Sequence, residues 1–158
     1  MDLLSQIKQD LLVAVKAREE LRSNTLRMLL AALNNKEIEK KTLLSRVGKE
    51  FAPLTEQEII QVIQKEVKQR KESAAGYRQG KREDLAQQEE AEAGILFAYL
   101  PEMLSEEQLR VKVVQAIKDL AISDISGMGK LMAYLSAELK SGADMCEVSR
   151  LVKQALTK

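Results

Sequence analysis

The residue types that usually carry out catalysis are scarce in this chain. It contains no histidine and a single cysteine, Cys146. Without histidine it lacks the usual general base near neutral pH, the imidazole metal ligand and any Ser–His or Cys–His nucleophile pair. A lone cysteine cannot form an internal disulfide or a structural zinc site, and Gly127–Lys130 lacks the spacing of a phosphate-binding loop. A hydrolase using Asp and Glu alone stays open, but we expect no independent catalysis, no metal and no cofactor.

Charge is distributed unevenly, although the formal net charge is only +1. Residues 65–82 carry seven basic and two acidic side chains, a net charge of +5, and residues 83–92 carry a net charge of −5. Lys68 and Lys71 share one helical face with Lys65. One interpretation is phosphate binding, with Tyr77 stacking on a base. The other is that two antiparallel helices neutralise each other, and the adjacency of the two blocks favours it.

A second group of basic residues lies in the last third of the chain. Arg150 and Lys153 share a helical face, and Lys130 follows Gly129 near an expected helix start, where backbone N–H groups bind phosphate. Acidic residues balance these cations in number, so a solvated surface is the default interpretation. The full set of candidate nucleic-acid-binding residues is Lys68, Arg70, Lys71, Tyr77, Lys130, Lys140, Arg150 and Lys153.

The composition predicts an all-α fold. Aromatic residues make up 3% of the chain, so its core must consist of Leu, Ile, Val, Ala and Met. Leu and Ala are strong helix formers, as are the abundant Glu, Lys and Gln. No apolar run approaches the roughly 20 residues that cross a bilayer, and residues 1–10 lack the basic start of a secretory signal. We therefore expect a cytoplasmic protein with no membrane partner.

Residues 1–100 predict an N-terminal unit of about four helices. Apolar residues at steps of three and four indicate helices over 3–15 and 26–38. The polar segment 22–25 is either a break or a bend. Residues 41–54 are the expected interruption, because they contain a glycine and a proline without apolar periodicity.

The third and fourth helices have clearer boundaries. Thr55 and Glu58 have the spacing of a capping box, in which each side chain satisfies a backbone N–H of the other residue. The third helix is expected to stop near Gly80. The fourth begins near Asp84 and ends before Pro101, because the residue preceding proline is disfavoured in helical geometry.

Residues 101–158 predict a small three-helix tail domain. Ser105 and Gln108 form another capping box, and Asp144 can cap the last helix. Gly127 and Gly142 separate the three apolar segments. A unit of this size is close to the lower limit for independent folding.

Ordered motifs along nearly the whole chain resemble the YqeY-like family. They are Thr25–Leu29, Glu37–Glu39, Glu66–Ser73, Tyr77–Leu85, Glu90–Pro101, Met128–Met132 and Ala143–Lys153. The family's tail is similar to the C-terminal domain of the B subunit of tRNA-dependent amidotransferase, which helps to hold the tRNA. The resemblance implies a tRNA-binding or amidotransferase-associated protein that lacks the catalytic domain. Two segments depart from the family pattern: 41–54 is longer than usual, and 140–144 has less Gly and Lys, which weakens phosphate binding there.

Three functions remain after this comparison. The leading hypothesis is a non-catalytic RNA-binding protein that uses the tail with help from the helix carrying Arg70 and Lys71. The second is a protein-interaction adaptor of the translation machinery, docked on an aminoacyl-tRNA-related enzyme. The third is an accessory subunit of a glutamine-dependent carbon–nitrogen ligase, which would need a partner to supply the active site. The tail resemblance and the +5 block favour the first.

Overall fold

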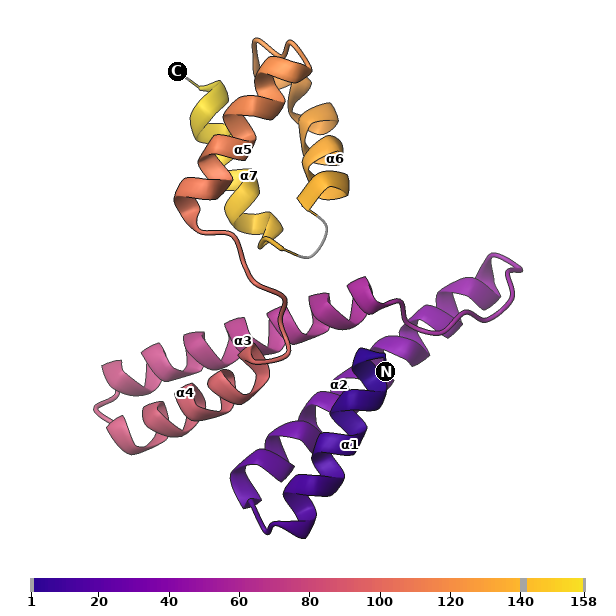
Figure 1. Ribbon diagram of the computed structural model, residues 1–158, viewed down its shortest axis with the longest axis vertical. Coiled ribbons are helices and arrows are strands. Elements are labelled where there is room, and N and C mark those ends of the chain that lie inside the picture. Colours follow the sequence, from indigo (N-terminus) through magenta and orange to yellow (C-terminus); the bar gives the residue numbers. More distant parts are fainter. Residues whose placement is uncertain (1, 140–141, 158) are drawn as a thin grey trace. The chain divides into compact units, whose positions relative to one another are not determined.

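A computed structural model describes residues 2–139 and 142–157, and the regular structure in these ranges is entirely helical (Figure 1). The all-α prediction is confirmed. The chain divides into two compact units, Met1–Leu100 and Pro101–Lys158, which we call the N-terminal unit and the tail unit. Each has its own hydrophobic core. Within the described residues, no helix combines the length and apolar character that a membrane crossing requires.

The N-terminal unit contains two antiparallel helix pairs (Figure 1). The first pair is α1 (Leu3–Lys16) and α2 (Glu20–Arg46), and the second is α3 (Glu56–Gln79) and α4 (Glu83–Phe97). All four helices contribute to one core, because each buries an apolar stripe. The buried members of this core are Ile7, Leu26, Leu29, Leu33, Ile59, Ile63, Val67, Ala93 and Leu96.

The course of α2 differs from the sequence expectation at both ends. Residues 22–25 lie inside the helix, because the Thr25 hydroxyl donates to the Leu21 carbonyl at 2.8 Å and so does not compete with the helical backbone. The chain turns earlier, at Arg18, which has a φ of 56°. The expected interruption at 41–54 is also too long, since α2 continues to Arg46. Five of residues 39–44 are strong helix formers (Glu, Lys or Leu), which explains the extension.

The predicted helix starts are confirmed in atomic detail. At the start of α3, the Glu58 N–H donates to Thr55 Oγ1 at 3.2 Å and the Thr55 N–H donates to Glu58 Oε2 at 2.7 Å. Ser105 and Gln108 form the equivalent pair of bonds at 3.3 and 2.9 Å. Asp144 accepts a hydrogen bond from a first-turn amide of the last helix at 2.8 Å. Local side-chain chemistry therefore fixes where these helices begin.

The tail unit contains α5 (Glu106–Asp119), the 3₁₀ turn η1 (Ile125–Gly127), α6 (Met128–Leu139) and α7 (Met145–Leu156). Its three α-helices surround a small aliphatic core. Met128, Met132 and Met145 are partly buried against this core. The fully buried centre consists of Val113, Leu131, Leu135, Val148 and Val152.

Candidate nucleic-acid interface

The two opposite charge blocks meet across the α3–α4 pair, where arginines bind carboxylates. Arg78 donates to the two Glu90 carboxylate oxygens at 2.5 and 2.7 Å, and to Glu83 at 3.3 Å. Arg82 binds Asp84 with both Nε and Nη2, at 3.1 and 3.0 Å. The hydrogen bond from Arg78 lowers the pKa of Glu90, and the same bond raises the pKa of Arg78. These two arginines therefore pair with three of the five carboxylates of the acidic block.

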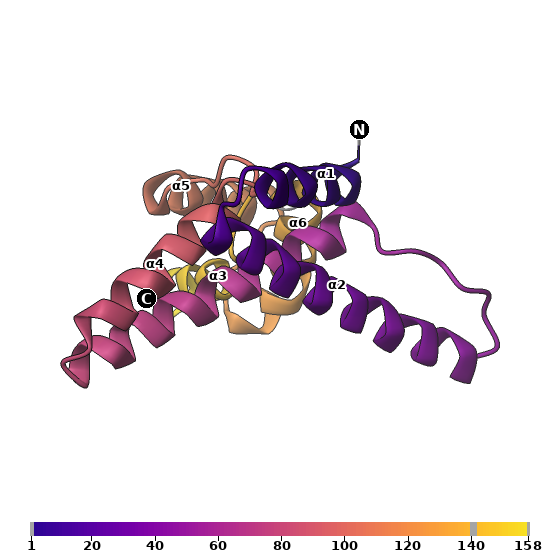
Figure 2. The same ribbon diagram turned by 90° about the horizontal axis from the view of Figure 1, so that it is seen from below.

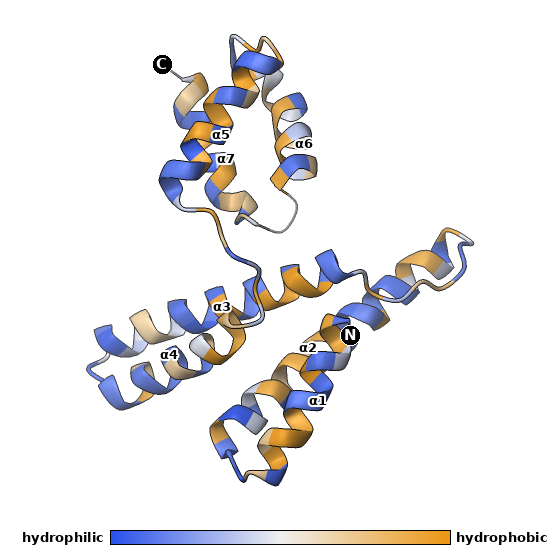
Figure 3. Cartoon of the chain, viewed as in Figure 1, coloured by the Kyte–Doolittle hydropathy of each residue, from blue (hydrophilic) through white to orange (hydrophobic). Residues whose placement is uncertain are grey.

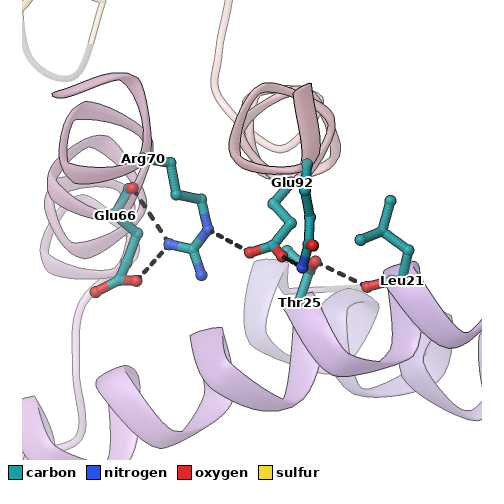
Figure 4. A network of polar contacts seen from close by, with 6 residues as sticks. Leu21, Thr25, Glu66, Arg70 and Glu92 are labelled. Atoms are coloured by element: carbon teal, nitrogen blue, oxygen red, sulfur yellow. Dashed lines mark hydrogen bonds and ion pairs between the residues drawn. The ribbon is translucent and has the colours of Figure 1, made fainter. Parts of the chain in front are cut away.

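Arg70 lies inside the N-terminal unit, with 5% of its surface exposed. Its Nη1 donates to the Glu66 carboxylate at 2.7 Å and to the Glu66 carbonyl at 3.2 Å, and its Nε donates to Glu92 at 3.2 Å (Figure 4). Gln88 also donates to Glu92, at 3.1 Å. Arg70 Nη2 is buried and has no hydrogen-bond partner within the described residues. The structure thus places this candidate away from any surface that RNA could reach.

Lys68 and Lys71 differ from the arginines of the same block. Both are exposed, and neither forms an ion pair within residues 2–139 and 142–157. The Lys71 ammonium lies 5.6 Å from the centre of the Phe97 ring, a cation–π distance. Tyr77 is 37% exposed in the last turn of α3. The lysines of α3 thus remain available for phosphate, and Tyr77 is accessible to a base.

The groove beside these residues offers a phosphate little unpaired positive charge. It lies between α2 and α3 and has a volume of about 650 Å³. Its charged lining consists of Lys36, Lys65, Glu39, Glu58 and Glu66. Each of its three carboxylates is already paired with a cation, Lys36, Lys40 or Arg70, so these charges largely cancel one another. Any phosphate contact made by α3 would involve its outer face rather than this groove.

The tail unit leaves two of its candidate cations free. Lys130 in α6 and Lys153 in α7 are exposed, and no carboxylate within the described part of the chain pairs with either. Arg150 donates to Glu147 and lies 3.6 Å from Glu106. The hydrogen bond that Arg150 donates to Glu147 raises the pKa of Arg150. Lys130 and Lys153 are therefore the stronger candidates, and Lys140 lies outside the described residues.

The start of α6 offers fewer free backbone donors than the sequence indicates. The 3₁₀ turn η1 runs directly into this helix, and the Met128 N–H already donates to the Ile125 carbonyl. Asp124 accepts the Ser126 N–H at 2.9 Å. Phosphate binding near Lys130 would therefore depend on its side chain more than on helix amides.

Sequence reasoning missed two neighbours of the candidate residues. Arg110 donates to Glu106 at 2.6 Å, so Glu106 serves both Arg110 and Arg150. The i,i+4 spacing of Glu106 and Arg110 was the available signal. Phe97 under Lys71 had no such signal, because the contact depends on how α3 and α4 pair. In the described residues, no group of three Cys, Asp or Glu side chains is arranged to hold a metal ion.

The chain matches a protein-family model and several similar proteins. A family model described as Yqey-like protein matches residues 4–156. The "Altered inheritance of mitochondria protein 41, mitochondrial" of Kluyveromyces lactis is 36% identical over 129 residues, which cover 80% of this chain and 64% of that protein. Its counterpart in Clavispora lusitaniae is 30% identical over 142 residues, covering 88% of this chain and 77% of the relative. This chain therefore spans about two thirds to three quarters of these relatives.

The relatives also correct the expected location. They are named as mitochondrial proteins, which contradicts the cytoplasmic location inferred from the sequence and points to mitochondria instead. That inference had considered only a secretory signal and a membrane-spanning run, and neither feature distinguishes these two compartments. The family match, by contrast, extends over nearly the whole chain and both of its helical units. This chain belongs to the YqeY-like protein family.

Proposed function

We propose that this chain is a non-catalytic RNA-binding protein that holds tRNA through its tail unit. The observation that carries the proposal is the pair of exposed tail lysines, Lys130 and Lys153, that lack carboxylate partners within the described residues. Lys68 and Lys71 on α3 provide further phosphate contacts. The resemblance of the family tail to the tail of the amidotransferase B subunit supports tRNA as the RNA.

The charge arrangement supports binding that is weak and sensitive to salt. Each lysine that neutralises a phosphate releases condensed counterions, and this release drives much of the affinity. Arg150 would first have to leave Glu147 and Glu106, so it contributes less than a free lysine. The net charge of +1 adds little long-range attraction.

The test is a fluorescence-anisotropy titration of bulk tRNA with the full chain at two salt concentrations. Reversing both lysines, K130E with K153E, is expected to weaken binding roughly tenfold and to reduce the salt dependence by about two phosphate contacts. Each single reversal, K130E or K153E, is compared with K118E, which makes the same charge change at an exposed lysine of the same unit outside the candidate set. Absence of binding by the unaltered chain at micromolar concentration would exclude the proposal. Equal losses of affinity in all variants would also contradict it, because binding would then depend on overall charge and not on Lys130 and Lys153.

A protein-interaction adaptor is the second candidate function. Val111 and Val114 on α5 are 69% and 48% exposed, and Val111 lines an open surface groove with Leu104. Exposed apolar side chains beside a groove are typical of protein-binding surfaces. An adaptor docking on an aminoacyl-tRNA-related enzyme would bind it with little salt dependence and would have no affinity for tRNA in the titration above.

A further inference from the structure

The distal part of α2 and the loop after it form a projection, which we call the α2 tip (residues 38–51). In both ribbon views α2 continues away from the other helices of the N-terminal unit before the chain returns to α3 (Figures 1 and 2). The cause is a difference in length, since α1 has 14 residues and α2 has 27. Hydrophobic and hydrophilic residues alternate along this projection (Figure 3). Four large apolar side chains in it are more than half exposed: Ile38 (55%), Leu43 (54%), Val47 (66%) and Phe51 (52%).

The apolar side chains of the α2 tip surround the helix rather than forming one stripe. Leu43 and Val47 are four residues apart and share a side. Ile38 is roughly half a turn around the helix axis from Val47, given about 100° per residue. Phe51 belongs to the returning loop, where its ring lies 6.0 Å from the Lys41 ammonium. A groove on a rigid partner covers one side of a helix, whereas a deformable apolar medium can surround all sides.

The unpaired charges of the α2 tip indicate which sign of charge its partner carries. Lys41, Arg46 and Lys49 are exposed, and none of them pairs with a carboxylate in the part of the chain that the structure describes. Of the two acidic residues, Glu39 is already bound by Lys36 at 2.9 Å, and Glu50 is exposed without an ion pair in the described residues. The unpaired charge is therefore predominantly positive, which complements an anionic surface.

We propose that the α2 tip binds the surface of an anionic lipid bilayer. Its apolar side chains enter the boundary between headgroups and acyl chains, and its cations contact the negative headgroups. Binding of this kind increases with buried apolar area and with attraction to anionic lipids. RNA would engage Lys41, Arg46 and Phe51 but would give Leu43 and Val47 no apolar environment. The expectation of no membrane partner rested on the lack of a spanning run, which peripheral binding does not require.

A single tryptophan tests this proposal directly in the full chain. The protein contains no tryptophan, so F51W introduces one reporter at the α2 tip. Vesicles of phosphatidylglycerol and phosphatidylcholine are expected to shift its emission to shorter wavelength and to carry the protein upward in a flotation gradient. Vesicles of phosphatidylcholine alone should do so much less, and added salt should reverse the anionic effect. A shift with bulk tRNA but not with vesicles would overturn the proposal, as would no shift with either.

Matched variants test whether vesicle binding depends on the apolar side chains of the α2 tip or on any exposed apolar side chain. L43S with V47S, in the F51W background, is expected to weaken vesicle binding by roughly tenfold or more, because the inserted apolar area is lost. The control is L12S with V13S, an exposed pair in α1 outside the tip at 62% and 51% exposure. Equal losses in both variants would overturn the assignment to the α2 tip. Far-UV circular dichroism establishes that each variant is folded, and unchanged tRNA affinity of the tip variant separates this proposal from RNA binding by the tail.

Discussion

The Arg70 guanidinium donates from Nε to the Glu92 carboxylate at 3.2 Å, and this contact joins α3 to α4 away from water. The same cation binds Glu66 one turn earlier on its own helix at 2.7 Å. The two carboxylate side chains are 17% and 13% exposed. One buried cation thus holds two carboxylates, and neither carboxylate has another cation partner within the described residues.

Removal of Arg70 is expected to destabilise the N-terminal unit severely. R70M leaves Glu66 and Glu92 poorly hydrated without their cation, and breaking a buried pair in this way costs about 3–5 kcal/mol. The measurement is urea unfolding followed by far-UV circular dichroism. The control is R78M, because Arg78 is 44% exposed and solvent screening leaves an exposed ion pair with little effect on stability. Similar free-energy losses in both variants would contradict the buried role of Arg70.

Ionisation of Tyr99 is expected to destabilise the folded protein at alkaline pH. Its hydroxyl donates to Asp10 at 2.6 Å, and burial, followed by this hydrogen bond, raises its pKa to about 12. Since the folded pKa lies above the ordinary value of 10.0, the stabilisation is complete below pH 10.0 and is lost as the pH rises toward about 12. Y99F should cost about 1 kcal/mol at neutral pH. It should also remove part of the alkaline loss, so parallel stability–pH curves for the two proteins would contradict the prediction.

The start of α3 is expected to weaken in acid. Hydrogen bonds from Lys40 and then from the Thr55 backbone lower the pKa of Glu58 below its ordinary value of 4.5. The resulting stabilisation is therefore present above pH 4.5 and is lost as the pH falls through the lower, folded-state pKa. E58Q should flatten this acid limb of the unfolding curve. T55A, which removes the cap, should cost about 1 kcal/mol throughout. An unchanged acid limb in E58Q would exclude this carboxylate as its source.

Local chemistry explains which parts of the fold could be predicted. Both capping boxes involve residues three apart, so their hydrogen bonds depend on almost nothing else. The apolar periodicity that predicted a helix over 26–38 similarly falls on Leu26 and Leu33, which are buried in the core. The same periodicity also included Ile38, which is 55% exposed because α2 extends beyond its partners. Periodicity reports which residues share a face, whereas helix lengths and pairing decide whether anything covers it.

The candidate interface was harder to predict because it depends on the pairing of distant residues. Arg70 and Lys71 are adjacent and belong to one basic block, yet the first is buried and the second is exposed. Arg70 falls on the buried stripe of α3 with Val67 and Ala74, whereas Lys71 lies about 100° further around the helix. The partner of Arg70, Glu92, is 22 residues further along the chain and reaches it only after α3 and α4 have paired. Sequence spacing could therefore have placed Arg70 on the buried face, but its carboxylate partner on α4 could not be predicted from spacing alone.

Two glycines at the junction of η1 and α6 are expected to respond oppositely to alanine. A Cβ on Gly127 would lie 2.6 Å from Ile122 Cγ2 and 3.1 Å from its Cγ1, so the branched side chain could not easily move aside. G127A should therefore destabilise the tail unit by about 1–3 kcal/mol through overpacking. A Cβ on Gly129 would meet no atom within 4 Å, and this residue lies inside α6. G129A should stabilise the unit by up to about 1 kcal/mol, the helix-propensity difference. Thermal unfolding of the full chain compares the two variants, and a stabilising G127A would mean that Ile122 does not pack against this turn.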